Sequence, residues 1–185
     1  MRYLIFFIII LLLFSSCKKQ SELSSIFKCN STDFDNLTVY KDFNKNFKLK
    51  IPKNWKTELY YNERQSEIFS ADTTKQLSET FILDVTYNYG ELNFEDSFFK
   101  KTDSLIAIKN LETVKKNTLE FKKKPAFWYV VKGTKKGFKY HQFNLLVKIN
   151  PNSYLSATSE IYGANAIEER ICSSIKLIEK IELLQ

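Results

Sequence analysis

The residue types that most often do chemistry in proteins are scarce in this chain. It contains one histidine, His141, and three cysteines, Cys17, Cys29 and Cys172. Zinc sites use several closely spaced Cys and His ligands, and no such pair is present. Cys172 lies among isoleucines, which would raise the pKa of a thiol, so a Cys172–His141 nucleophile pair is disfavoured. We therefore expect no catalytic site, no metal and no cofactor.

Carboxylates give no stronger signal. Asp33 and Asp35 begin like a calcium-binding loop, but that pattern then lacks its Gly at the sixth position and its Glu at the twelfth. Glu168 and Glu169 stand at the expected start of a helix, where the helix dipole explains acidic residues. His141 shares a predicted strand face with apolar residues, so we expect it in or near the core.

The first residues follow the pattern of an export signal. Met1–Tyr3 carries one positive charge, and an apolar core runs from Leu4 to Phe14. These eleven residues would rise only about 16 Å as a helix, well short of the roughly 30 Å hydrocarbon core of a bilayer. The segment is predicted to be a signal peptide, and a membrane-spanning helix is disfavoured.

The end of this segment resembles the lipobox of bacterial lipoproteins, because the small residues Ser15 and Ser16 precede Cys17. The resemblance implies that residues 1–16 are removed and that Cys17 carries acyl chains, which anchor the protein to a membrane. An ordinary secretory signal that happens to contain a cysteine is the alternative. Lys18 stands where an Asp would retain a lipoprotein in the inner membrane, so we expect the outer membrane, facing the periplasm.

Two cysteines remain once Cys17 is lipidated. In an oxidising compartment Cys29 and Cys172 could form a disulfide that joins the segment before the first strand to the last helix. Two buried free thiols are the alternative. Residues 17–185 carry a formal net charge of +6, one less than the +7 of the whole chain because Arg2 is removed. We expect no nucleic-acid partner for an exported protein.

The distribution of polar residues divides the chain simply. The stretch from Lys18 to Ser25 is polar and aperiodic, so residues 17–25 are predicted to be a lipidated cysteine and a tether. No internal repeat or second linker follows. Residues 26–185 are therefore predicted to form one domain, which is long enough to bury a single core.

Period-two alternation of apolar residues predicts several strands. It is clearest at residues 47–51 and 81–88, whereas residues 125–132 are apolar on both faces, as in a strand covered on both sides. Turn residues at 133–137 and 150–152 connect this strand to strands at 138–149 and 154–159. These last three strands are predicted to form an antiparallel meander.

Two segments have helical periodicity. Asn93 is the expected N-cap of the first helix, whose buried stripe would contain Phe94, Phe98, Leu105 and Ile108. Asn165 and Glu168 resemble a capping box before the second helix, whose buried side would contain Ile167, Ile171 and Ile175. Helices that interrupt an antiparallel sheet indicate an α+β protein.

The order of these elements is similar to that of PsbP-like domains over residues 38–182. The opening hairpin supplies the clearest motif, in which an aromatic residue, an alternating strand and a Pro-x-Asn-Trp step follow one another: Asp42-Phe43, then Phe47-Lys48-Leu49-Lys50-Ile51-Pro52-Lys53-Asn54-Trp55. The resemblance implies an αβα sandwich with a central, mostly antiparallel sheet. It also implies an accessory role: one such protein stabilises the oxygen-evolving cluster of photosystem II, and a relative binds a nuclear-transport GTPase.

One charged segment stands out. Nine lysines and one acidic residue lie between Lys115 and Lys139, and the strand order predicts that they gather at one end of the sheet. The lysines chosen as a surface for an anionic partner are Lys122, Lys124, Lys135 and Lys136. A solvated edge that prevents aggregation is the alternative.

The leading functional expectation is a membrane-anchored, non-catalytic accessory protein that docks on an envelope protein or complex. The alternative is a carrier that holds a small apolar ligand in a pocket between sheet and helix. An internal cavity would favour the carrier. A solidly packed interior with an exposed apolar or basic patch would favour docking.

Overall fold

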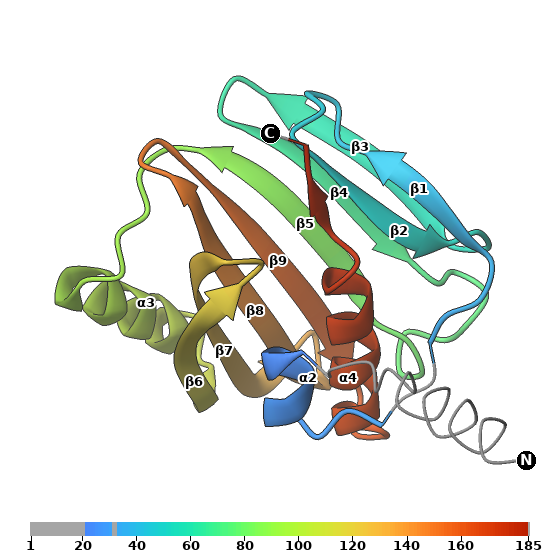
Figure 1. Ribbon diagram of the computed structural model, residues 1–185. Helices are drawn as coiled ribbons and strands as arrows, with labels where there is room; N and C mark the ends of the chain where they lie inside the picture. Colours follow the sequence, from blue (N-terminus) through green and yellow to red (C-terminus); the bar gives the residue numbers. More distant parts are fainter. Residues whose placement is uncertain (1–20, 31–32, 185) are drawn as a thin grey trace, which may run out of the picture.

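The computed structural model describes residues 21–30 and 33–184, and its centre is a seven-stranded sheet (Figure 1). Every neighbouring pair of strands is antiparallel, in the order β3-β4-β5-β9-β8-β7-β6. The strands are β3 (Lys56–Asn62), β4 (Gln65–Ala71), β5 (Ile82–Tyr89), β6 (Glu112–Phe121), β7 (Lys124–Lys135), β8 (Phe138–Asn150) and β9 (Ser153–Tyr162).

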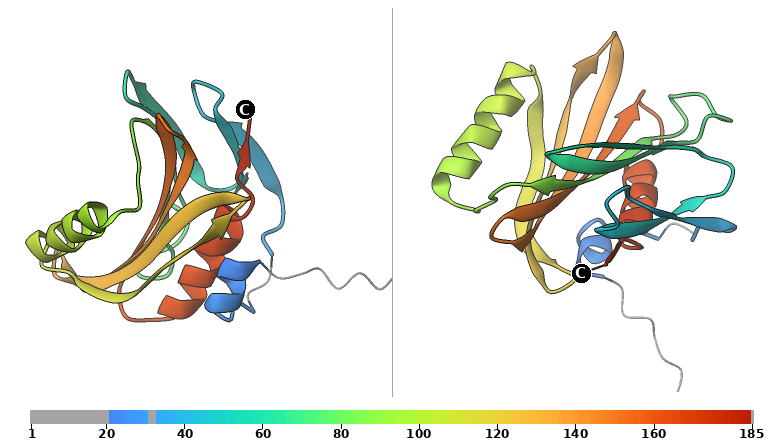
Figure 2. Two further views of the ribbon diagram at one scale, coloured as in Figure 1. Left: turned by 60° about the vertical axis from the view of Figure 1, so that its left-hand side comes forward. Right: turned by 90° about the horizontal axis from the view of Figure 1, so that it is seen from above.

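The remaining elements cover this sheet from both sides (Figure 2). Helix α3 (Asp96–Ile108) lies on one face. The other face carries α2 (Glu22–Ile26), α4 (Ile167–Ile178) and a three-stranded sheet of β1 (Leu37–Lys41), β2 (Phe47–Pro52) and β10 (Glu182–Leu183). We call these the α3 face and the α4 face. The layers confirm the predicted α+β class and the mostly antiparallel sheet.

Alternation in β2 places it as the sequence suggests. Phe47, Leu49 and Ile51 are fully buried in the core, where they meet α4. Lys48 and Lys50 point outward and pair with Glu182 of β10 at 2.8 and 3.3 Å. Trp55 follows the end of the strand and packs edge-to-face on Phe81, 5.0 Å between ring centroids, which closes this side of the core.

The β7–β8 turn is shorter than predicted. Residues 133–135 continue β7, and Lys135 pairs with Phe138, so only Lys136 and Gly137 form the turn. Both have positive φ, 50° and 81°, as a two-residue type I′ hairpin requires. The flanking Gly133 and Gly137 are typical of turns, so the sequence predicts Thr134 and Lys135 to be turn residues although the strand continues through them.

The predicted tether is wrong at its carboxyl-terminal end. Residues from Ser21 onward belong to the folded domain, because Ser21 caps α2 by accepting a bond from the Ser24 amide at 3.0 Å. Leu23 is buried in the core, and the Ser24 hydroxyl donates to Glu179 at 2.7 Å. Residues 17–20 lie outside the described residues. A five-residue helix is too short to show periodicity in the sequence, which explains the error.

The predicted start and stripe of the first helix are also wrong. The N-cap of α3 is Glu95, and Asn93 instead accepts a bond from Lys148 at 2.5 Å. Ile106 is buried, whereas Leu105 and Ile108 are 48% and 75% exposed. Phe94 precedes the helix, so a stripe counted from Phe94 selects the wrong residues farther along α3.

The final helix has the predicted buried side but no capping box. Ile171 and Ile175 are buried, and Ile167 packs at the edge of the core. Its N-cap is Ala166, with φ of 48° and no side-chain bond to the helix. The turn is stabilised instead by Arg170, whose guanidinium donates to the carbonyls of Thr80, Tyr162 and Asn165 at 3.0, 2.7 and 2.6 Å.

Candidate functional site

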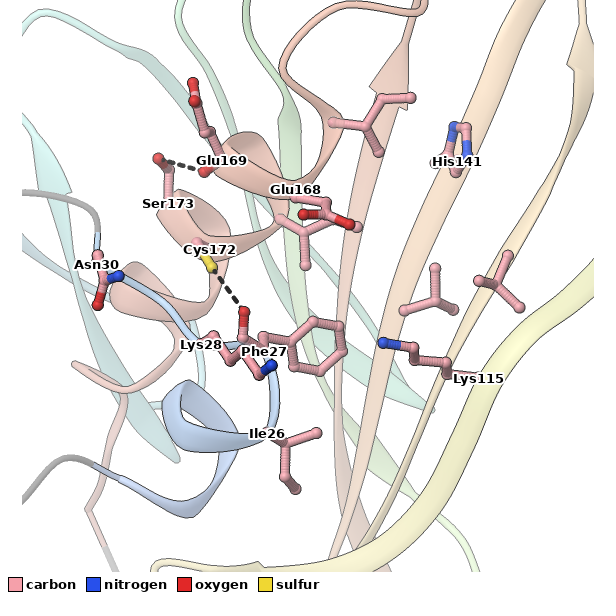
Figure 3. Close-up of a pocket in the computed structure, with 14 residues that line it drawn as sticks. Ile26, Phe27, Lys28, Asn30, Lys115, His141, Glu168, Glu169, Cys172 and Ser173 are labelled. Atoms are coloured by element: carbon pink, nitrogen blue, oxygen red, sulfur yellow. Dashed lines mark hydrogen bonds between the residues drawn. The ribbon is translucent and has the colours of Figure 1, made fainter.

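An open cleft of about 960 Å³ lies between α4 and the strands β6, β7 and β8 (Figure 3). It lies beside α2, because the two residues at the end of that helix, Ile26 and Phe27, line it. The other apolar residues of its lining are Val114, Val130, Ile167 and Ile171. Ligand sites typically combine such an apolar lining with a few polar groups.

One wall of the cleft is attached to the domain by a disulfide. Cys29 and Cys172 are bonded, with an S–S distance of 2.06 Å, across 143 residues of chain. The bridge holds the segment after α2 against α4, and this is the pair that the cysteine count allowed. Beside it, the Phe27 ring packs edge-on against Trp128 and Phe143, at 4.9 and 5.6 Å between centroids.

Charged groups of opposite sign stand on opposite walls at the mouth. Lys115 extends from β6 toward the middle of the cleft, and Glu168 extends from α4 toward the sheet (Figure 3). Neither side chain has an ion pair within the part of the chain that the structure describes. Lys28, Glu169 and Ser173 also line the cleft, and the Ser173 hydroxyl donates to the Glu169 carbonyl.

His141 supplies a third polar group. It lies on β8, on the same face as Phe143, and reaches the cleft rather than the core interior. Its Nδ1 atom is buried without a hydrogen-bond partner among the described residues. Burial lowers the pKa of His141, and the positive charges of Lys132, Arg170 and Lys139 lower it further. The imidazole is therefore neutral at physiological pH and can make one more hydrogen bond.

These residues do not form a catalytic arrangement. Cys172 is bonded to Cys29, so it has no thiol for His141 to activate. Within residues 21–30 and 33–184, no three His, Cys, Asp or Glu side chains are grouped to hold a metal ion. In the same ranges, no helix is long and apolar enough to cross a bilayer. Cys17 lies outside the described residues.

The predicted lysine cluster is wrong as a single surface. Lys122 and Lys124 lie at the β6–β7 turn, whereas Lys135 and Lys136 lie at the β7–β8 turn. The ends of the twelve-residue β7 are about 37 Å apart, because a strand rises roughly 3.4 Å per residue. The strand predicted at residues 125–132 separates the two pairs of lysines, so they cannot gather at one end of the sheet.

Most of these ammonium groups already have partners in the domain. Lys122 donates to the Glu179 carbonyl and Lys124 to the Ile149 carbonyl, each at 3.0 Å. Lys135 pairs with Glu160 at 2.7 Å. Lysines that donate to carbonyls or pair with a carboxylate of their own domain stabilise the fold. The alternative of a solvated edge that prevents aggregation therefore explains this segment better than a binding surface does.

Comparison with known proteins supports the fold only. No protein-family model matches the chain, and no curated protein sequence matches it. Among solved structures, the cyanobacterial PsbP protein CyanoP of Synechocystis aligns with a TM-score of 0.57 and 9% identity, over 84% of this chain and 96% of that one. The chain has a PsbP-like fold.

Two other solved structures agree with this. A mutant of protein Mog1 aligns with a TM-score of 0.51 and 9% identity, over 81% of this chain and 97% of that one. A structure from Bacteroides thetaiotaomicron aligns with a TM-score of 0.50 and 10% identity, over 81% of this chain but 48% of that one. At such identities a shared fold does not transfer a function.

Proposed function

We propose that this protein is a lipid-anchored, non-catalytic binding protein of the cell envelope, and that its cleft holds a small ligand with an apolar part. One observation carries the proposal: a cleft of about 960 Å³ has an apolar lining, with His141 in it, and carries Lys115 and Glu168, neither of which has an ion pair among residues 21–30 and 33–184. Ligand pockets are commonly about 300–1,000 Å³ with this mixture of groups. The cleft lies between sheet and helix, where the carrier alternative places its pocket, although it is open to the surface and is not the internal cavity expected for a carrier.

The proposed anchor would keep this cleft close to a membrane. Helix α2 begins at Glu22, five residues after Cys17, and five residues span at most about 18 Å. Ile26 and Phe27, which line the cleft, follow directly. A protein acylated at Cys17 would therefore present the cleft near the bilayer surface, which in our proposal is the periplasmic face of the outer membrane.

Docking on an envelope protein is the second candidate, and a different surface favours it. Phe43 and Tyr61 stack with parallel rings 3.6 Å apart, although they are 53% and 58% exposed. The Tyr89 hydroxyl nearby accepts bonds from Asn44 and Asn46 at 3.3 and 3.1 Å. This aromatic tip lies at the β1–β2 connection, far from α2 in Figure 1. Exposed Tyr and Phe are common at the centres of protein interfaces.

A cleft-filling substitution tests the proposal. Val114 is 45% exposed on the cleft wall, so Val114→Trp fills the space without disturbing the core. Leu105→Trp on α3, which is 48% exposed, is the matched control. Full-length protein would be extracted from envelopes in mild detergent, and co-purifying small molecules would be measured by mass spectrometry.

We expect a small molecule with the wild-type and Leu105→Trp proteins, and a loss of about tenfold with Val114→Trp, or roughly 1.4 kcal/mol. Equal recovery from all three proteins would contradict the proposal. So would recovery of a protein partner alone, if that partner is lost on Tyr61→Ala and kept on Val114→Trp; this result would establish the docking alternative. Cys17→Ser should move the protein out of the membrane fraction.

A further inference from the structure

The cleft combines an apolar floor with opposite charges at its mouth. We infer that its ligand is a zwitterionic amphiphile, with one apolar chain and a head group carrying an anion and a cation, as in the single-chain (lyso) form of an aminophospholipid of the anchoring membrane. This inference rests on the proposed function and specifies its ligand. The apolar chain lies on the floor, and the head group lies between Lys115 and Glu168.

The anion-binding side is defined by two neighbouring lysines that point in opposite directions. Successive residues of a strand face opposite sides of the sheet. Lys116 reaches Asp103 of α3 at 2.7 Å, which satisfies its charge on the α3 face. Lys115 is left on the cleft side with no ion pair among the described residues. A phosphate or carboxylate at the mouth would supply the missing partner.

The cation-binding side is defined in the same way by two neighbouring glutamates. Both lie in the first turn of α4, where the helix dipole favours acidic residues. Both side chains line the cleft, but the dipole does not explain their directions: Glu168 extends across the mouth toward the strands, whereas Glu169 points away from the strands (Figure 3). An ammonium group of the ligand would pair with Glu168.

A ligand with one charge would satisfy only half of this arrangement. A fatty acid could pair with Lys115 but would bring a second negative charge toward Glu168. An alkylamine would have the reverse fault. The unpartnered His141 Nδ1 can hydrogen-bond to a head group of either kind, so it does not decide between them.

The position of the cleft selects the source of such a molecule. Two of the residues that line it, Ile26 and Phe27, lie at the end of α2. In the anchored protein the nearest amphiphiles are therefore lipids of the bilayer. Tethering raises the effective concentration of those lipids at the cleft without any new contact. An apolar peptide with both charged termini would have the same pairing chemistry, and the experiment includes it.

The test uses the full chain in a nonionic detergent and three photoactivatable probes with the same single acyl or alkyl chain. One probe has a phosphoethanolamine head, one is a fatty acid and one is an alkylamine. Intact-mass measurement gives the labelled fraction, and peptide mapping locates the label. We expect the phosphoethanolamine probe to label the cleft most, and a zwitterionic apolar tripeptide not to compete.

Four variants separate the two charges. Lys115→Gln should lower labelling by the phosphoethanolamine and fatty-acid probes about threefold, and Glu168→Gln should do the same for the phosphoethanolamine and alkylamine probes, because pairs at an exposed mouth contribute up to about 1 kcal/mol. Lys116→Gln and Glu95→Gln, the latter at the exposed N-cap of α3, make the same charge changes away from the cleft and should have no effect.

The outcomes that contradict the inference are distinct. If each cleft variant behaves like its control, or if all three probes label the cleft equally, the head-group assignment is wrong while an apolar ligand site remains. If the tripeptide displaces every probe, the ligand is a peptide. If no probe labels the cleft and Val114→Trp changes nothing, the proposed function fails as well.

Discussion

The two faces of the seven-stranded sheet are covered very differently. On the α4 face, α2, α4 and the small sheet bury one continuous core, to which the disulfide is attached. On the α3 face, the cover is a single helix; its rings Phe98 and Phe99, with Phe94 just before it, surround Phe127. The comparison indicates that the α4 face provides most of the stability. The cleft lies at the edge of the elements that cover this face. The same elements, α4 and the segment that the disulfide joins to it, therefore stabilise the domain and line the proposed binding site.

The uncovered part of the α3 face is polar. Glu160 on β9 is half-buried and accepts bonds from Lys135, Tyr140 and Tyr162 at 2.7, 2.9 and 2.8 Å. Burial alone would raise the pKa of Glu160, but these bonds outweigh it and lower the pKa. Asp84 has no comparable set of donors, so burial raises its pKa. The ionised form of an acid on this face is therefore stabilised only where hydrogen-bond donors surround it.

Loss of the disulfide should have the largest effect. Replacing both Cys29 and Cys172 with Ser should lower the free energy of unfolding by about 4 kcal/mol, because the bridge closes a loop of more than a hundred residues in the unfolded chain. Urea unfolding of the double variant and of the wild-type protein measures this. A loss below about 1 kcal/mol would contradict the view that the α4 face depends on the bridge.

A matched pair of isoleucines compares the two helices. Ile175→Ala on α4 removes a fully buried side chain and should destabilise the protein by about 3 kcal/mol. Ile108→Ala on α3, where the residue is 75% exposed, should change stability by less than about 0.5 kcal/mol. The free energy of unfolding of both variants, measured by heat or urea, tests this prediction. Similar losses of stability in the two variants would contradict the difference between the faces.

The carboxylates of the α3 face should give the smallest effects, with opposite signs at neutral pH that both fade in acid. Because the pKa of Glu160 is lowered in the folded state, its contribution is present above its unfolded pKa near 4.5 and is lost as the pH falls through the folded value. Glu160→Gln should therefore lose about 1 kcal/mol at neutral pH and less in acid.

Asp84 should behave in the opposite way. Its pKa is raised in the folded state, so its carboxylate opposes folding at neutral pH, and this effect disappears as the pH falls through the folded value toward 3.8. Asp84→Asn should stabilise the protein at pH 7 and have no such effect near pH 3. The free energy of unfolding, measured between pH 3 and pH 7, tests both residues. If it changed with pH in the same way for the two variants, the opposite pKa shifts of Glu160 and Asp84 would be contradicted.

Local patterns in the sequence were sufficient for much of the fold. Alternation identified β2 and β5, and an apolar run with two turn signals identified the meander of β7, β8 and β9, within a few residues, because these patterns are local. The errors are of two kinds. The elements α2, β3, β4 and β6 were not predicted, and the start of α3 and the length of the β7–β8 turn were misplaced, because these features depend on contacts with distant residues.

Some features required the tertiary structure. Counting cysteines allowed the Cys29–Cys172 bond, but only the packing of the segment after α2 on α4 brings the two sulfurs together. The lysine-rich segment was evident from composition, yet the length of β7 decides that its ends lie far apart. Lys115 and Glu168 face one cleft although 53 residues separate them, and no local pattern links them. Composition and periodicity act between near neighbours, whereas a binding site is made of side chains that only the folded backbone brings together.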